Sequence, residues 1–225
     1  MKNLLKILDK MKKCILIGAI SLSLYLPIGA AGNQPQEELD EMTFIEMINS
    51  VDLGNQSSFI QKYQEKEARS KLLSKFDSQE ARKEGCRVET FRNKEVILVT
   101  IPASLLFAPN STELSSKASE YLSPFKRYLN NPDTYRVLLV MHTDNTGSET
   151  YRETITEKRV DAVFDWFEAQ GGDTSFLFPY AMGDDMPLMK NNDSQENRNK
   201  NRRLEIYLVP GEKMLEMAKK GKIEF

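Results

Sequence analysis

An acidic residue and an arginine fifteen positions apart form the most informative pair in this chain. Asp144 follows a short apolar run and precedes turn-forming residues, so we expect it where a strand ends. Arg159 lies in the next predicted helix, one turn after Ile155 and one turn before Val163, on a mostly apolar arc. Charged side chains are rarely fully buried unless they are paired. The two residues therefore define a candidate binding site.

A second interpretation of Arg159 is a snorkelling side chain, with its stem on the core and its guanidinium in water. The helix position alone does not decide between the two interpretations, and the acid at the strand end favours the site. A strand is predicted over 135–141. Thr150 and Glu153 fit a capping box that opens the next helix, and Gly171 with Gly172 ends that helix after about residue 170.

The remaining elements complete an α+β fold. Residues 86–91 and 95–101 predict a hairpin with its turn at 92–94, and residues 203–209 predict the last strand. A helix is predicted over 115–130, which Pro124 should kink or split. Residues 173–200 form a long connection with a short helix near 194–199. The predicted fold is a split β-β-α-β-α-β mixed sheet with helices on one face, preceded by a helical region.

The N-terminus predicts export. Residues 1–13 are basic, residues 14–28 are mainly apolar, and residues 29–32 are small, which is the pattern of a signal peptide over residues 1–31. Cys14 lies at the start of the apolar run and not after it, so it does not fit a lipidation site. Removing residues 1–31 changes the net charge from −2 to about −6, which argues against non-specific nucleic-acid binding, and no nucleic-acid partner is expected. Cys86 is then the one remaining thiol, and burial at the start of a strand is expected.

The domain organisation follows from these patterns. Residues 32–84 are polar and then helical, residues 85–210 form the folded domain, and residues 211–225 form a C-terminal helical tail. Two interpretations of the helical part, residues 41–84, are open. It is a spacer between membrane and wall, which we favour, or a surface on which another envelope protein docks.

Residues 107–208 resemble the OmpA-like peptidoglycan-binding domain, a module of outer-membrane proteins, peptidoglycan-associated lipoproteins and flagellar stator proteins. The resemblance rests on the order and spacing of five segments: Phe107-Ala108-Pro109-Asn110, His142-Thr143-Asp144-Asn145-Thr146-Gly147, Thr156-Glu157-Lys158-Arg159, Gly183-Asp184-Asp185-Met186-Pro187 and Asn201-Arg202-Arg203-Leu204-Glu205-Ile206. It implies that Asp144 and Arg159 hold the diaminopimelate of the stem peptide.

The chemistry of this ligand fits the pair. The side-chain end of diaminopimelate carries an ammonium, which a fixed carboxylate takes, and a carboxylate, which a guanidinium takes through two parallel hydrogen bonds. Such a site needs no cofactor, metal or catalytic group, and the single histidine, His142, makes a histidine triad or a multi-histidine metal site implausible. We interpret His142 as structural and expect no enzyme activity.

Further candidate contacts are Asn110, Thr146, Arg152 and Thr156, with Arg198 and Arg202 in a basic cluster beside the groove. One arginine of that cluster, which includes Arg203, is expected to pair with Asp144 or to line the groove, and the others to be solvated. Arg152 departs from the asparagine usual in the family. It either strengthens carboxylate binding, repels the ammonium or points away.

The sequence thus predicts an exported protein of the periplasm or cell envelope, associated with the outer membrane, that binds peptidoglycan non-covalently. Two alternatives are a membrane-anchored, stator-like component with a retained N-terminal helix and an envelope scaffold with weakened ligand binding. A wall hydrolase or amidase would need a catalytic constellation that the sequence does not offer.

Overall fold

A computed structural model describes residues 36–224, which fall into two compact units, one ending at Ser50 and one spanning Val51 to Phe225. The described part of the first unit holds α2 (Gln36–Asp40) and α3 (Phe44–Ile48). Thr43 opens α3 through a capping box with Glu46, whose carboxylate accepts from the Thr43 backbone N–H at 2.9 Å. The predicted signal peptide lies outside the described residues.

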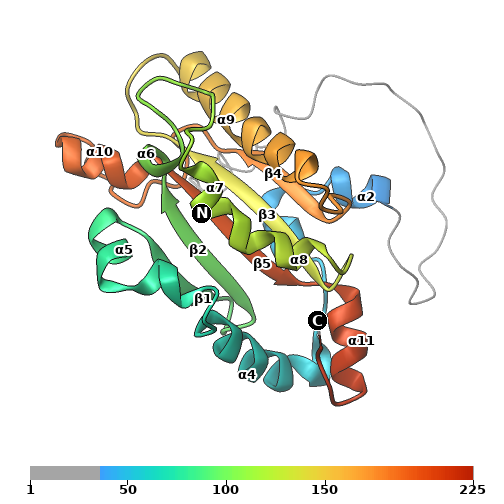
Figure 1. The fold of residues 1–225 in the computed structure, drawn as a ribbon. Helices are drawn as coiled ribbons and strands as arrows, with labels where there is room; N and C mark the ends of the chain where they lie inside the picture. Colours follow the sequence, from blue (N-terminus) through green and yellow to red (C-terminus); the bar gives the residue numbers. More distant parts are fainter. Residues whose placement is uncertain (1–35, 225) are drawn as a thin grey trace. The chain divides into compact units, whose positions relative to one another are not determined.

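The second unit is built on one five-stranded mixed sheet with the strand order β1-β2-β5-β3-β4 (Figure 1). β4 runs parallel to β3, and the other pairings are antiparallel. The central position therefore belongs to the last strand in sequence, β5. The strands are β1 (Arg87–Phe91), β2 (Val96–Pro102), β3 (Tyr135–His142), β4 (Leu177–Ala181) and β5 (Arg203–Pro210).

The predicted α+β fold is confirmed, and the sheet has one strand more than we predicted. β4 lies inside the stretch 173–200, which the sequence analysis treats as a connection with one short helix. Pro179 cannot donate a backbone hydrogen bond and argues against a central strand. The structure accommodates it because β4 is an edge strand that pairs only with β3, with Pro179 opposite Leu139.

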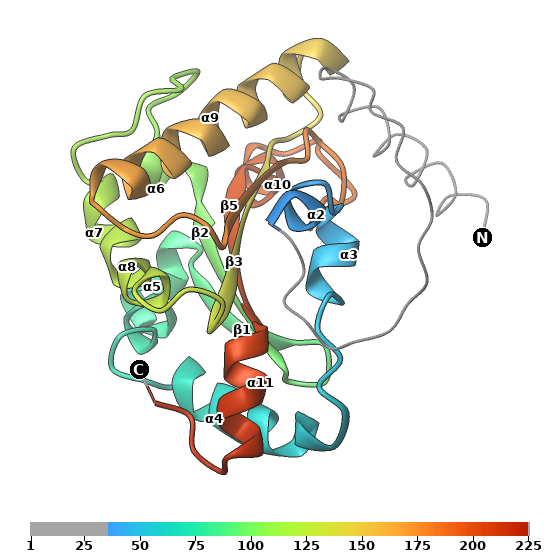
Figure 2. The same ribbon diagram turned by 90° about the vertical axis from the view of Figure 1, so that its right-hand side faces the viewer.

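Helices pack on the face of this sheet that carries alternate residues such as Val137 and Leu139. α6, α7 and α8 follow one another along it, and α9 covers β3 and β4 (Figure 2). The helices of this unit are α4 (Ser57–Ala68), α5 (Gln79–Glu84), α6 (Ala103–Leu106), α7 (Ala118–Leu122), α8 (Lys126–Leu129), α9 (Glu149–Ala169), α10 (Gln195–Asn201) and α11 (Glu212–Lys219). Short 3₁₀ turns cover Gly54–Gln56, Ser74–Asp77 and Ser123–Phe125.

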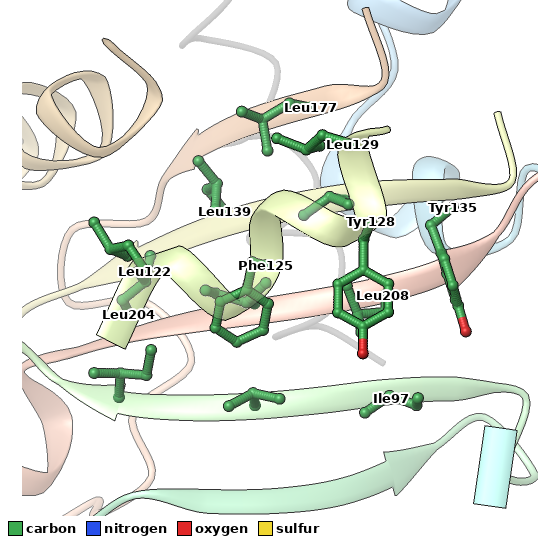
Figure 3. Packing of buried hydrophobic residues seen from close by; sticks show 14 of the residues in the cluster. Ile97, Leu122, Phe125, Tyr128, Leu129, Tyr135, Leu139, Leu177, Leu204 and Leu208 are labelled. Carbon is green, nitrogen blue, oxygen red and sulfur yellow. The ribbon is translucent and has the colours of Figure 1, made fainter. Parts of the chain in front are cut away.

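Pro124 divides the helix predicted over 115–130, as expected. α7 ends at Leu122, the 3₁₀ turn Ser123–Phe125 follows, and α8 begins at Lys126. The division lets Leu122, Phe125 and Leu129 all point at the sheet, where they meet Leu139 and Leu204 (Figure 3). Because proline lacks the N–H of a regular turn, the chain changes helix type here instead of continuing.

Residues 51–84, expected as a spacer, lie in the same compact unit as the sheet. Ile60 of α4 and Phe76 of the turn Ser74–Asp77 are buried in the common core, where the Phe76 ring lies 5.4 Å from that of Phe125. Gln64 is fully buried and accepts a hydrogen bond from the Tyr135 hydroxyl at 2.7 Å. This segment is therefore an integral layer of the domain. The predicted C-terminal tail also joins the core, through Met214, Leu215 and Ala218 of α11.

Within residues 36–224, no helix is both long enough and apolar enough to span a bilayer.

Candidate functional site

The acid lies in the turn that follows β3, as predicted. Asp144 comes two residues after the strand ends at His142, and the Thr143 N–H is bonded to the Gly183 carbonyl at 2.8 Å. Asp144 Oδ1 accepts from the Thr146 backbone N–H at 2.8 Å and from the Thr146 hydroxyl at 2.5 Å. An aspartate that bonds the backbone two residues later forms a local turn of fixed shape. The Asp144 carboxylate is therefore held in one orientation.

The arginine comes from α9, whose start differs slightly from our prediction. Ser148, not Thr150, is the N-cap, because its hydroxyl accepts the Tyr151 N–H at 3.2 Å. Gly147 directly before it has φ of 85°, in the left-handed region that favours glycine. The helix therefore begins at Glu149, before the predicted capping box, and still presents Arg159 toward the sheet side.

Arg159 is buried, which excludes the snorkelling interpretation. Only 5% of the residue is exposed. Its Nε donates to the Ser111 carbonyl at 2.9 Å, and its guanidinium carbon lies 4.9 Å from the centre of the Phe107 ring. Burial lowers the pKa of Arg159, and the nearby charge of Arg202 lowers it further, although the pKa of an arginine remains far above neutrality. The site thus holds a fixed positive group.

Arg202 is the ionic partner of the acid. Its Nη1 lies 2.6 Å from Asp144 Oδ2, and its Nη2 donates to Asn199 Oδ1 at 2.5 Å. The Arg202 side chain is 29% exposed, whereas that of Asp144 is 1% exposed. The more accessible arginine therefore covers the acid. We expected one arginine of the cluster Arg198, Arg202 and Arg203 to pair with Asp144 or to line the groove, and in the structure it is Arg202.

These groups line one cavity of about 620 Å³, within the range of small-molecule sites. The loops next to β3 and β5 contribute Asp144, Thr146 and Arg202. Helix α9 contributes Arg159, and the loop after α6 contributes Asn110. Asn110 adopts φ of 57° and accepts a hydrogen bond from the Tyr151 hydroxyl at 3.3 Å. The structure therefore brings together Asp144 and Arg159 with three of the other predicted contacts.

Arg152 and Thr156 lie elsewhere, so their assignment as ligand contacts is corrected. Arg152 Nε donates to Asp184 Oδ1 at 2.8 Å, and its Nη1 donates to the Gly147 carbonyl at 2.6 Å. The fully buried Thr156 hydroxyl accepts the Gly183 N–H at 3.1 Å and donates to carbonyls of its own helix. Both residues attach the 182–184 turn to α9. Of the three roles predicted for Arg152, the structure supports the one in which its side chain points away from the ligand site.

Arg198 also differs from its predicted place beside the groove. Its guanidinium donates to the Asn192 carbonyl at 2.7 Å and to the Asp193 carbonyl at 3.1 Å, which ties the preceding loop to α10. Arg203, expected to be solvated, is instead buried and bonded to Glu205 Oε1 at 2.7 Å. Arginine positions one residue apart at a strand start face opposite sides of a sheet, which separates Arg202 from Arg203.

His142 is part of the buried cluster around Glu205. Its Nε2 lies 3.3 Å from Glu205 Oε2, and its Nδ1 lies 3.1 Å from the Asp185 carbonyl. Tyr207 donates to the same carboxylate at 2.7 Å. Burial alone would raise the pKa of Glu205, but His142 and Arg203 outweigh it and hold that pKa at about 2. This cluster supports the structural interpretation of His142.

Several cavity residues escaped the sequence analysis. Tyr151 lines the cavity and bonds Asn110, and Glu84 and Tyr121, which bond each other, also line it. Glu84 belongs to a segment that the sequence analysis treated as a spacer, so nothing pointed to its presence here. Phe107 and Asn110 were noted as motif residues, but the stacking of Phe107 on Arg159 depends on contacts between residues far apart in sequence.

The fold thus places an acid and two arginines, Asp144, Arg159 and Arg202, in the wall of one small polar cavity. Residues 106–202 match the model of the OmpA family, and this segment of the chain is an OmpA-like domain of that family. The match runs from the end of α6 to Arg202, so it contains Asp144 and Arg159.

One curated relative is the outer-membrane lipoprotein YfiB of Pseudomonas aeruginosa, 30% identical over 110 residues, which cover 49% of this chain and 64% of the relative. The chain thus spans less than two thirds of that protein. Among solved structures, a MotB-like protein of Desulfovibrio vulgaris superposes with a TM-score of 0.57 at 21% identity, covering 68% of this chain and 95% of the other. The cell wall anchor of the type VI secretion system of P. aeruginosa superposes with a TM-score of 0.52 at 25% identity, covering 61% and 96%.

Proposed function

We propose that this chain binds peptidoglycan non-covalently through the diaminopimelate of the stem peptide. The observation that carries the proposal is that a fixed carboxylate, Asp144, and a fixed guanidinium, Arg159, both lie in the wall of one cavity. The OmpA family assignment of this segment and the resemblance to a solved cell wall anchor support the same class of ligand.

Each end of the ligand has a complementary group. The ammonium of diaminopimelate is directed to Asp144, whose Oδ1 is engaged by Thr146, so it would share Oδ2 with Arg202 or displace Arg202 from it. The neighbouring carboxylate is directed to Arg159. Its Nε is used by the Ser111 carbonyl, which leaves the two terminal nitrogens for the ligand. Charge-assisted pairs of this kind are among the stronger hydrogen bonds in proteins.

The envelope location and the lack of catalysis belong to the same proposal. The chain is proposed to be exported and to act as an anchor, with residues 1–31 removed. N-terminal sequencing of the protein from the envelope tests this, because retention of residues 1–31 in a membrane pellet would favour the stator-like alternative. Incubation with purified sacculi should release no more soluble muropeptide than a heat-killed control, and any excess release would contradict the non-enzymatic function.

The direct test uses calorimetry with a stem peptide that contains diaminopimelate. Arg159→Lys keeps the charge but not the planar fork, and it should weaken binding by roughly 2–5 kcal/mol. Asp144→Asn should also abolish measurable binding, since a neutral amide does not balance an ammonium. Arg69→Lys, the same substitution at an exposed position on the end of α4, is the matched control and should bind like the wild type.

Circular dichroism must show that every variant is folded. If folded Arg159→Lys and Asp144→Asn both bind like the wild type, the ligand is not held here. A second candidate function, a scaffold with weakened ligand binding, is favoured by one observation: Arg202 occupies Asp144 Oδ2. Failure of the wild type to bind sacculi would support that candidate.

A further inference from the structure

The cavity is lined by more residues than the diaminopimelate site uses. Besides Asp144, Arg159 and Phe107, its lining includes Ser104, Ser116, Lys117, Tyr121 and Glu84, and we call the part around the Tyr121–Glu84 hydrogen bond its far end. The side-chain end of diaminopimelate fills only the part between the acid and the arginine. A ligand that carries this group on a longer molecule must leave through the rest of the cavity, so the far end deserves its own interpretation.

Glu84 is held at this far end by the way α5 stops. Gly85 adopts φ of 106°, and the Cys86 N–H bonds back to the Ala81 carbonyl at 2.9 Å, which forms a tight left-handed helix end. The Cys86 side chain is fully buried and anchors this turn to the core. The exposed carboxylate of Glu84 is therefore fixed at its base and projects at the rim of the cavity.

Tyr121 faces Glu84 across this end. Its hydroxyl lies 3.3 Å from Glu84 Oε2 and is placed to donate to it, and its ring is half-buried against the core on α7. Ser104 and Ser116 add exposed hydroxyl groups. This part of the cavity thus combines a carboxylate, a lysine ammonium, a phenol, two alcohols and an aromatic ring. It accepts and donates hydrogen bonds at once and offers an apolar surface beside them.

We propose that Glu84 and Tyr121 form a second subsite that binds a saccharide unit of the glycan to which the stem peptide is attached. Sugar hydroxyls match the mixed donors and acceptors, and the C–H face of a sugar ring matches the aromatic surface. A further stretch of stem peptide is the alternative occupant, since its carboxylates would be repelled by Glu84 but attracted by Lys117, and the test below separates the two. The inference rests on the proposed function of the Asp144–Arg159 end.

This subsite combines two parts of the chain. Tyr121 lies within the OmpA-like segment 106–202, whereas Glu84 comes from α5, which precedes that segment. The helical region before the domain therefore adds a wall to the binding cavity, in addition to its role in the core. The consequence is a preference for peptide that is still linked to glycan over free peptide.

The test compares two ligands by calorimetry: a free stem tripeptide containing diaminopimelate, and the same tripeptide attached to its disaccharide. The wild type should bind the disaccharide-linked ligand about tenfold more tightly, as expected for one or two additional hydrogen bonds. Glu84→Ala should reduce this preference to about twofold and leave the affinity for the free tripeptide unchanged. Tyr121→Phe, which keeps the ring and removes the hydroxyl, should reduce it partially.

Glu80→Ala is the matched control, because Glu80 is an exposed glutamate on the same helix and does not line the cavity. It should keep the full preference. Equal binding of the two ligands by the wild type would overturn the saccharide subsite and leave the proposed function standing. An equal loss for both ligands in Glu84→Ala would overturn it as well, in favour of a peptide contact. Failure of the wild type to bind either ligand would instead overturn the proposed function.

Discussion

Arg202 Nη1 lies 2.6 Å from Asp144 Oδ2, so the protein supplies its own cation to the acid of the site. The arginine is the accessible member of the pair, and it is also held by Asn199 of α10. A ligand ammonium that reaches Asp144 must displace Arg202 or share the carboxylate with it. If the proposed function holds, the ion pair is therefore both a stabilising contact of the free protein and a competitor of the ligand.

Replacing Arg202 by glutamine should separate these two effects. The free energy of unfolding of the ligand-free protein should fall by about 1–3 kcal/mol, because the buried Asp144 loses its charged partner. The melting temperature should rise more on addition of the diaminopimelate stem peptide than it does for the wild type, since the ammonium replaces the lost cation. Differential scanning calorimetry measures both. A smaller ligand-induced rise in the variant would show that Arg202 contributes to binding and does not compete with it.

Arg152→Asn should leave ligand affinity within about twofold of the wild type, because Arg152 bonds Asp184 and the Gly147 carbonyl. The unfolding free energy should decrease by no more than about 1 kcal/mol, since the Arg152–Asp184 pair is partly exposed. Calorimetry and urea denaturation report the two quantities. A tenfold or larger loss of affinity would mean that Arg152 turns toward the ligand.

The Glu205 cluster predicts a specific dependence of stability on pH. The pKa of Glu205 is lowered to about 2, so the ionised carboxylate stabilises the folded state. This contribution, about 3 kcal/mol, is fully present above the ordinary glutamate pKa near 4.5 and is lost as pH falls from there through 2. Glu205→Gln should therefore be destabilised at pH 7 and approach the wild type near pH 2. Urea denaturation across this range measures the difference, and a constant gap at all pH values would exclude the ionic origin.

Shortening the chain tests whether residues 51–84 are part of the domain. A fragment that starts at Val51 should unfold cooperatively, whereas one that starts at Gly85 loses Ile60, Leu73 and Phe76 from the core. At about 1.5–3 kcal/mol for each buried side chain, the loss approaches the whole stability of a small domain. Circular dichroism during heating compares the two fragments. Equal melting temperatures would support the interpretation of residues 51–84 as a spacer.

The local elements of the site were predictable, because they depend on short-range chemistry. The apolar run before Asp144 and the glycines after the long helix fixed β3 and α9 closely, and Pro124 divided its helix where expected. β4 was not predicted, because a short strand that contains a proline, here Pro179, has the sequence pattern of a loop. The pattern of residues does not show which strands end up at an edge.

Contacts between distant segments could not be predicted in the same way. The Asp144–Arg202 bond joins residues 58 positions apart, and the Tyr121–Glu84 bond joins residues 37 positions apart. Both depend on the strand order and on how the loops settle at one end of the sheet. The same reason explains Arg152 and Arg198: their types suggested anion binding, but nearby carbonyl and carboxylate groups use their hydrogen bonds.

The central position of β5 makes assembly of the site depend on the last strand in the sequence. β5 is the last strand to leave the ribosome, and it alone joins the β1–β2 hairpin to the β3–β4 pair. Until it inserts, Arg202 has no fixed place and the walls contributed by Glu84 and Asp144 belong to separate halves. An incompletely folded chain therefore has no assembled cavity, and capture by an immobile polymer would select finished molecules.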